Sequence, residues 1–175
     1  MNKGLGRYLL ITFAATMTLL SAVIAFNTVI DPLGMYVSGV HKPAMYNRVR
    51  LLKAYEVRRV QPESIVLGTS RVHLGISPRH PGWANSYEHR YNLAFDGATT
   101  KEMYAYLKHA DAAGGLRHVM LGLDTYHLNA TSGTVRPDFD ASILMDERIA
   151  LNHARMLLAD LKLLSSYSTL KESFQ

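Results

Sequence analysis

The sequence predicts an α/β domain with a parallel sheet, placed behind a single N-terminal transmembrane helix. The first observation is a run of 19 consecutive residues without a charge, from Tyr8 to Phe26. The second is an alternation of short apolar runs with helical patterns between residues 48 and 164, without a hairpin pattern. Three strands are expected. A parallel sheet needs cover on both faces, so the predicted class is a three-layer α/β/α domain.

The apolar run at the N-terminus is long enough to cross a hydrocarbon core of roughly 30 Å. Lys3 and Arg7 precede it and no acidic residue comes before Asp31, so the positive-inside rule keeps the short N-terminus in the cytoplasm. We expect residues 1–26 to form the cytoplasmic tip and anchor, and residues 27–47 a connector. The alternative is a signal peptide cleaved near Ala25, although the apolar run exceeds the usual length for one.

Composition narrows the classes of function. The chain has no cysteine, which excludes disulfides and thiolate metal sites, and its eight histidines form no ligand pattern. No metal and no cofactor is predicted. The net charge is +5, and many basic residues gather at 48–59, where we expect a solvated basic helix face. That face could instead touch anionic headgroups or an acidic polymer. Translocation across the membrane argues against a nucleic-acid partner.

The elements of the predicted domain follow one another from residue 48 to residue 175. A helix at about 48–60 stops before Pro62, and apolar strands follow at 64–68, 91–95 and 118–123. A helix capped by Thr99 or Thr100, with Glu102 in its first turn, ends at Gly114-Gly115. A helix at about 143–164 presents an apolar side that includes Leu157, Leu158 and Leu161. No fourth strand follows, so we expect the domain to be incomplete.

Polar residues follow each predicted strand at its carboxyl end. The three sequences are Gly68-Thr69-Ser70-Arg71, Asp96-Gly97-Ala98-Thr99 and Asp124-Thr125-Tyr126-His127. In open α/β sheets, ligands bind beyond the carboxyl ends of the strands. We therefore expect these three segments to lie side by side and to form the site.

The same segments carry a family resemblance. Ile65-Val66-Leu67-Gly68-Thr69-Ser70-Arg71 resembles the first block of SGNH/GDSL-type hydrolases, and in particular their membrane-anchored branch that resembles alginate and teichoic-acid acylation proteins. Tyr91 to Ala98 is similar to the second block, and Leu121-Gly122-Leu123-Asp124 stands where the third block falls. The connector segment from Asn27 to Gly34 is similar to that of such envelope proteins.

The resemblance implies a role for each site residue. Ser70 would be the nucleophile and the Gly97 amide an oxyanion donor, with Thr69, Arg71 and Asn92 contacting the substrate. A serine hydroxyl needs a base and oxyanion donors to react. The alternative for Ser70 is that it caps the following helix.

Two features depart from the family. The third block usually carries an asparagine that donates, whereas an ionised Asp124 only accepts. The family's C-terminal Asp-x-x-His has no match after residue 130. Asp124 and His127 have that spacing and could supply a surrogate base and its orienter. The alternative is that Asp124 caps the next segment or accepts from backbone amides.

These observations lead to two hypotheses. The first is a membrane-anchored SGNH-like serine esterase or acyltransferase that acts on a cell-surface polysaccharide outside a bacterial inner membrane. The second is a non-catalytic tethered scaffold or binding subunit of an envelope polysaccharide assembly complex. Both imply the lipid bilayer as a partner, with a polysaccharide and other envelope proteins as further candidates.

Overall fold

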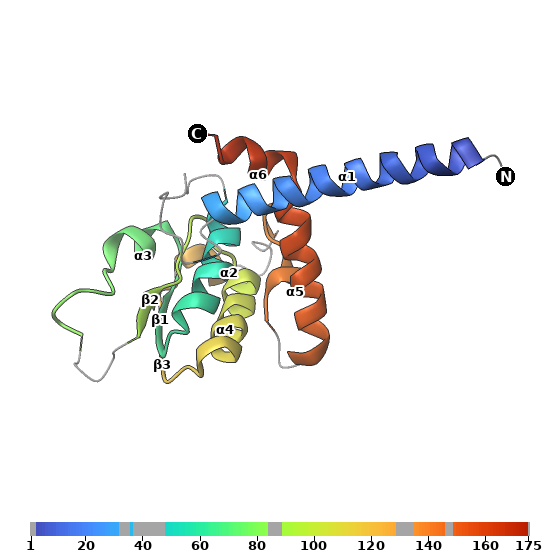
Figure 1. Cartoon of the computed structure of the whole chain (residues 1–175). Helices are drawn as coiled ribbons and strands as arrows, with labels where there is room; N and C mark the ends of the chain where they lie inside the picture. The colour runs from blue at the N-terminus through green and yellow to red at the C-terminus, as the bar shows by residue number, and fades with distance from the viewer. Residues whose placement is uncertain are drawn as a thin grey trace. The chain divides into compact units, whose positions relative to one another are not determined.

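The computed structural model describes residues 3–31, 36, 48–83, 89–128, 135–145 and 149–174. The chain divides into two compact units, which are described separately (Figure 1). The first unit holds the N-terminal helix together with the residues from Leu157 onward. The second holds the residues between Ala44 and Met156. The sequence analysis placed the residues after 157 in the α/β domain.

The second unit is built on a parallel sheet of the order β2-β1-β3. The strands are β1 (Ser64–Leu67), β2 (Arg90–Asn92) and β3 (His118–Leu121). All three predicted strands are present, although each ends earlier than expected. The backbone after β2 still bonds to the β1 segment, since Leu93 N–H donates to Val66 and Phe95 N–H donates to Gly68. The α/β class with a parallel sheet is therefore confirmed.

Two helices, α2 (Val49–Val60) and α4 (Thr100–Gly114), pack against each other and cover one face of the sheet (Figure 1). Their buried side chains include Leu52, Val57 and Tyr106. Helix α4 begins in a capping box, in which the Thr99 hydroxyl accepts from Glu102 N–H and the Glu102 carboxylate accepts from Thr99 N–H. It ends at Gly115, whose φ of +68° is the left-handed conformation that glycine adopts readily. Both ends agree with the prediction.

The short helix α3 (Ser70–Gly75) follows β1 directly. Gly68 and Gly122, at the ends of β1 and β3, allow Val72 of α3 to approach the strand ends closely: a Cβ on Gly68 would lie 2.5 Å from Val72 Cγ2. All four residues of β3 are exposed, and Leu121 is 51% exposed. The sequence analysis expected both faces of the sheet to be covered. Among the described residues, the side chains of β3 are not covered.

The first unit is dominated by α1 (Lys3–Ile30), which is long and apolar enough to cross a membrane. Helix α6 (Tyr167–Glu172) contacts α1, and α5 (Ile149–Leu164) ends beside α1 at Leu164. Asn27 of α1 is fully buried; its side-chain amide donates to the Leu164 carbonyl over 2.5 Å, and its Oδ1 accepts from the Ser173 hydroxyl over 2.9 Å. The predicted helix at 8–26 is confirmed and is longer at both ends. Most of the predicted connector, namely 32–35 and 37–47, lies outside the described residues.

Candidate functional site at the strand ends

The central position of β1 brings the three predicted segments together at one edge of the sheet. Because β2 lies on one side of β1 and β3 on the other, the chain direction of the crossovers reverses at β1. This reversal is a topological switch point, where open α/β sheets bind ligands. The segments after Leu67, Asn92 and Leu121 all leave the sheet at this edge. The expected juxtaposition of the three strand ends is confirmed.

Ser70 is the first residue of α3, immediately beyond the end of β1. The helix N-cap is Thr69, so Ser70 does not hold the capping position that the alternative assigned to it. The Ser70 side chain is half-buried, and its hydroxyl has no hydrogen-bond partner within the described part of the chain. This hydroxyl is therefore free to meet a ligand.

Asp124 joins the end of β3 to the end of β1. Its Oδ2 accepts from the Thr69 hydroxyl over 2.5 Å, and its Oδ1 accepts from Arg71 Nη1 over 2.8 Å. The Thr69 hydrogen bond, helped by the charge of Arg71, holds the pKa of Asp124 below its ordinary value. Asp124 is therefore ionised at neutral pH. Arg71 is 83% exposed, so its guanidinium can also be reached from solvent.

His127 connects the β3 segment to the loop after β2. Its Nδ1 accepts from the backbone N–H of Asp124 over 2.9 Å, and its Nε2 lies 2.9 Å from the Ala98 carbonyl oxygen. A carbonyl only accepts, so this pattern assigns the proton of neutral His127 to Nε2. The carboxylate of Asp124 is bonded to Thr69 and Arg71 rather than to the imidazole. In this arrangement both ring nitrogens are occupied by backbone groups.

Gly97 lies in the turn after β2 and has a φ of +57°, a conformation that glycine tolerates best. A Cβ at this position would lie 2.5 Å from Nη2 of Arg136. The guanidinium of Arg136 therefore rests on the Gly97 backbone, with Asp96 Oδ2 3.9 Å away. Within the described residues, the Gly97 N–H has no hydrogen-bond acceptor.

Asn92, which we expected to contact substrate, holds α3 in place. Its side-chain amide lies 2.7 Å from the Ile76 carbonyl and 3.3 Å from those of Val72 and His73, and its Oδ1 accepts from Ala94 N–H over 3.0 Å. The Val72 carbonyl also accepts from Ile76 N–H, so the Asn92 amide adds to the hydrogen bonds that close the carboxyl end of α3. Asn92 is 9% exposed. Its side chain holds the carboxyl end of α3, the helix that begins with Ser70.

The sequence analysis missed a buried ion pair beneath the site. Arg50 and Glu102 are 4% and 0% exposed, with 2.9 Å between Arg50 Nε and Glu102 Oε1. Arg50 also donates to Asp138 over 3.2 Å and to the Asp96 carbonyl over 3.1 Å, and its guanidinium lies 4.8 Å from the centre of the Phe95 ring. The predicted solvated basic face is therefore wrong at Arg50. No local pattern indicates this, because Glu102 lies 52 residues away in the sequence.

Lys53 also departs from the predicted basic face. It is 5% exposed, and its ammonium group donates to the Asn92 carbonyl over 2.6 Å. Burial lowers the pKa of Lys53 to about 8, and the nearby charge of Glu56 only partly offsets this effect. Lys53 therefore holds the backbone of Asn92, and the side chain of Asn92 in turn holds α3.

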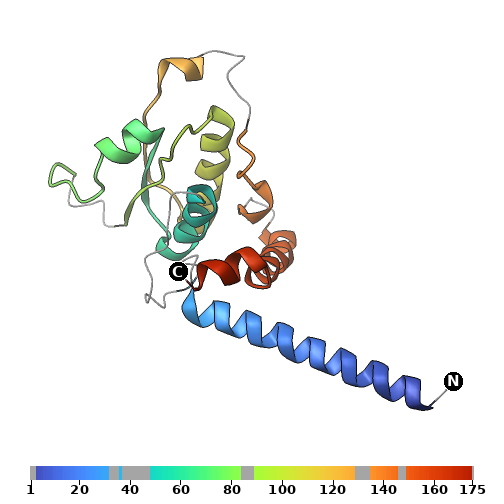
Figure 2. The same ribbon diagram turned by 90° about the horizontal axis from the view of Figure 1, so that it is seen from above.

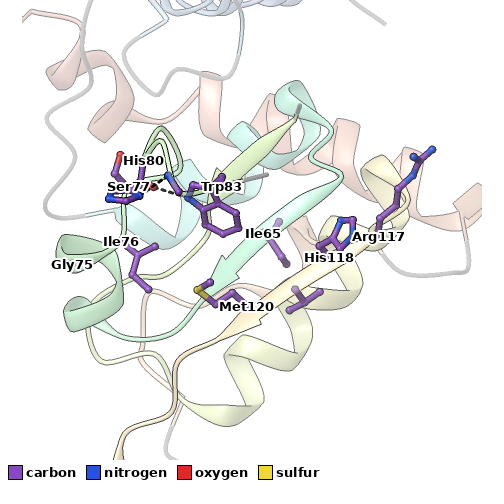
Figure 3. Close-up of a pocket in the computed structure, with 11 residues that line it drawn as sticks. Ile65, Gly75, Ile76, Ser77, His80, Trp83, Arg117, His118 and Met120 are labelled. Carbon is purple, nitrogen blue, oxygen red and sulfur yellow. Dashed lines mark hydrogen bonds between the residues drawn. The ribbon is translucent and has the colours of Figure 1, made fainter. Parts of the chain in front are cut away.

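A separate cavity of about 970 Å³ lies beside the first residues of β3 (Figure 3). Its wall combines apolar side chains with basic ones, and the residues that line it include Ile65, Ile76, Trp83, Arg117, His118 and Met120. Trp83 is held there by a hydrogen bond from its indole N–H to the Ser77 carbonyl. The cavity lining does not include Ser70, Gly97 or Asp124.

Within the described residues, no group of three or more histidine, aspartate or glutamate side chains could hold a metal ion. Comparisons of the chain with protein-family models, with curated proteins and with solved structures find no match.

Proposed function

We propose that the chain is a membrane-anchored, SGNH-like serine esterase or acyltransferase that acts on a cell-surface polysaccharide. One observation carries this proposal: Ser70, with a hydroxyl free of partners among the described residues, follows the central strand at the switch point of the sheet. Gly97 and Asp124 follow the two neighbouring strands at the same edge. Their order along the chain is the one that the family resemblance implies.

The proposed reaction begins when Ser70 Oγ attacks an acyl carbonyl. The carbonyl oxygen becomes an oxyanion, and the backbone N–H groups of Ser70 and Gly97 are the candidate donors to it. Loss of the leaving alcohol gives an acyl-serine. Water then releases the acid in an esterase, whereas a sugar hydroxyl takes the acyl group in an acyltransferase.

Two groups could take the Ser70 proton. His127 would have to give up its hydrogen bond from Asp124 N–H before Nδ1 could accept a proton. The alternative base is a histidine contributed from outside this chain. Arg71, exposed beside Ser70, is the candidate contact for a negatively charged polymer or for the acyl carbonyl.

The N-terminal helix indicates on which side of a membrane this reaction would take place. α1 is long and apolar enough to span a membrane, and Lys3 and Arg7 favour a cytoplasmic N-terminus. The α/β unit would then face the outside of a bacterial inner membrane, where surface polysaccharides are modified. The lipid bilayer would be the first partner, and other envelope proteins are further candidates.

The second candidate function is a non-catalytic, membrane-tethered scaffold or polysaccharide-binding subunit. The hydrogen bonds of Asp124 and His127 favour it, because the groups with Asp-x-x-His spacing are both occupied by other partners. In this function the strand ends would bind a polymer through Arg71 without turning it over.

The decisive experiment is labelling of the full chain in native membranes with a fluorophosphonate, together with hydrolysis of 4-nitrophenyl acetate. We expect wild type to be labelled and active, and Ser70→Ala to lose both. Ser142→Ala, which changes an exposed serine in a polar turn, is the matched control and should keep both. Labelling that persists in Ser70→Ala, or wild type without labelling and turnover, would overturn the catalytic proposal and leave the binding function.

A further inference from the structure

The second half of α5 carries an exposed row of leucines. Leu157, Leu158 and Leu161 are 62%, 67% and 45% exposed, and their spacing puts them on one side of the helix. The sequence analysis predicted an apolar side of this helix that includes these leucines. Its exposure in the structure indicates an interaction surface, since contiguous apolar surface is uncommon unless something covers it.

This leucine row belongs to the same compact unit as the membrane-spanning helix. Leu164, one turn beyond Leu161, accepts a hydrogen bond from buried Asn27 of α1. After α6, Ser173 bonds to the same Asn27, and the rings of Phe174 and Phe26 stack with 5.3 Å between their centres. The end of α5 and the end of α6 are therefore fixed at the level of Phe26 and Asn27.

That level is one turn before the outer end of the charge-free run, which extends to Ile30, and Asn27 is the first amide side chain within it. All described side chains of α1 from Gly4 to Ala22 are exposed. Burial in α1 begins only at Val23. In Figure 1 the second half of α5 runs transverse to α1 rather than alongside it, and in Figure 2 α5 is accordingly seen nearly end-on. If α1 spans a bilayer, residues 157–164 extend along its outer surface.

We propose that the leucine row of α5 is a second membrane contact, which lies in the boundary between headgroups and acyl chains of the outer leaflet. An amphipathic helix that lies on a membrane buries its apolar side in this boundary. Phe174 and Phe26 would sit at the depth where aromatic rings gather. Lys162 of α5 and Lys171 of α6 are exposed and supply positive charge for anionic headgroups. The inference rests on the proposed function only in requiring that α1 spans the bilayer.

The absence of cysteine allows a direct test with single-cysteine variants of the full chain. Leu158→Cys and Leu161→Cys are labelled with a fluorophore that reports polarity, and the protein is placed in vesicles of phosphatidylcholine and phosphatidylglycerol. Leu10→Cys, within α1, is the control for the anchor. Ser142→Cys, exposed on the α/β unit, is the control for a position in water. Two α5 positions are used so that one perturbing label cannot decide the result.

We expect labels at 158 and 161 to show blue-shifted emission and to be quenched by lipids that carry a nitroxide near the headgroup. The label at 142 should show neither effect, and the label at 10 should be quenched by lipids that carry a nitroxide on the acyl chain. Water-like emission at 158 and 161 with lipid quenching at 10 overturns this proposal and leaves the anchor intact. Water-like emission at 10 as well overturns the anchor. Blue-shifted labels that resist lipid quenching but transfer energy between two labelled copies assign the leucine row to a second copy and overturn the lipid contact.

Discussion

The carboxylate of Glu102 serves two elements at once: it accepts from the N–H of Thr99 in the cap of α4 and from the guanidinium of Arg50 in α2. Both side chains of the ion pair are almost fully enclosed. Burial alone would raise the pKa of Glu102, but the hydrogen bonds from Arg50 and Thr99 outweigh it and hold the pKa below the ordinary value.

Removal of one member of this pair should therefore destabilise the α/β unit strongly. We expect Glu102→Gln to lower the free energy of unfolding by about 3–5 kcal/mol, because it leaves the Arg50 charge buried without its main counter-ion. Trp83, the single tryptophan, lies in this unit and reports urea unfolding of the full chain in detergent by fluorescence.

The matched control for that prediction is Arg117→Gln, which removes an exposed, loose ion pair with Glu63. A surface change of this kind should alter the free energy of unfolding by less than about 0.5 kcal/mol. Equal changes in the free energy of unfolding for Glu102→Gln and Arg117→Gln would show that the buried ion pair contributes no more to stability than the exposed one.

His109 should make stability depend on pH. It is fully buried in α4, with Nε2 2.8 Å from the Ala54 carbonyl and Nδ1 accepting from Met145 N–H, and burial lowers its pKa from 6.5 to about 4. The unfolded chain thus binds a proton at a higher pH than the folded one. Stability is full above pH 6.5 and falls as the pH drops toward 4, by on the order of 3 kcal/mol in total.

We expect His109→Gln to flatten the slope of unfolding free energy against pH between about 6.5 and 4.5, where carboxylates contribute least. Burial also lowers the pKa of His73, so His73→Gln is the comparison. It should remove a smaller part of the slope. A slope that is unchanged in His109→Gln would contradict the assignment.

The close approach of Val72 to Gly122 gives a prediction that can be tested by rescue. A Cβ on Gly122 would collide with Val72 Cγ2, so Gly122→Ala should cost about 1–3 kcal/mol of unfolding free energy through overpacking. Val72→Ala removes the colliding methyl groups. The double variant should therefore be more stable than the sum of the two single changes predicts, and strictly additive losses would rule out the contact.

Asn92 should act through stability rather than through substrate affinity. Asn92→Asp keeps the acceptor for Ala94 N–H but removes the donors that hold the carbonyls of α3. We expect a loss of about 1–3 kcal/mol in unfolding free energy, because the amide donor to the carbonyls of His73 and Ile76 is lost. Unchanged stability combined with weaker polysaccharide binding would return Asn92 to the substrate-contact role that the sequence analysis gave it.

Features set by neighbouring residues were predicted well from the sequence. The capping box of α4 depends on Thr99 and Glu102, three positions apart, and the strands are short apolar runs bounded by turn residues. The meeting of the strand ends also follows from local information once the sheet is parallel. These features need no knowledge of distant contacts.

Features that depend on distant partners were not predictable in the same way. Arg50 has the sequence environment of a solvated residue, and only Glu102 and Asp138 make its burial possible. The spacing of Asp124 and His127 is correct for an acid–base pair, but spacing does not specify which atoms face each other. The Asp124 carboxylate bonds to Thr69, 55 residues away, and the imidazole bonds to the backbone of the same turn.

The order β2-β1-β3 also has a consequence for how the strand-end site assembles. Pairing of β1 with β2 joins Ser64 to Arg90, whereas pairing of β1 with β3 joins Ser64 to His118 across roughly twice as many residues. The longer closure costs only about 0.6 kcal/mol more in chain entropy. The chain between Ser64 and His118 nevertheless contains β2 and the whole of α4. We therefore expect the Thr69–Asp124 contact to be among the last to form, so that Ser70 gains its final surroundings only when the rest of the sheet is in place.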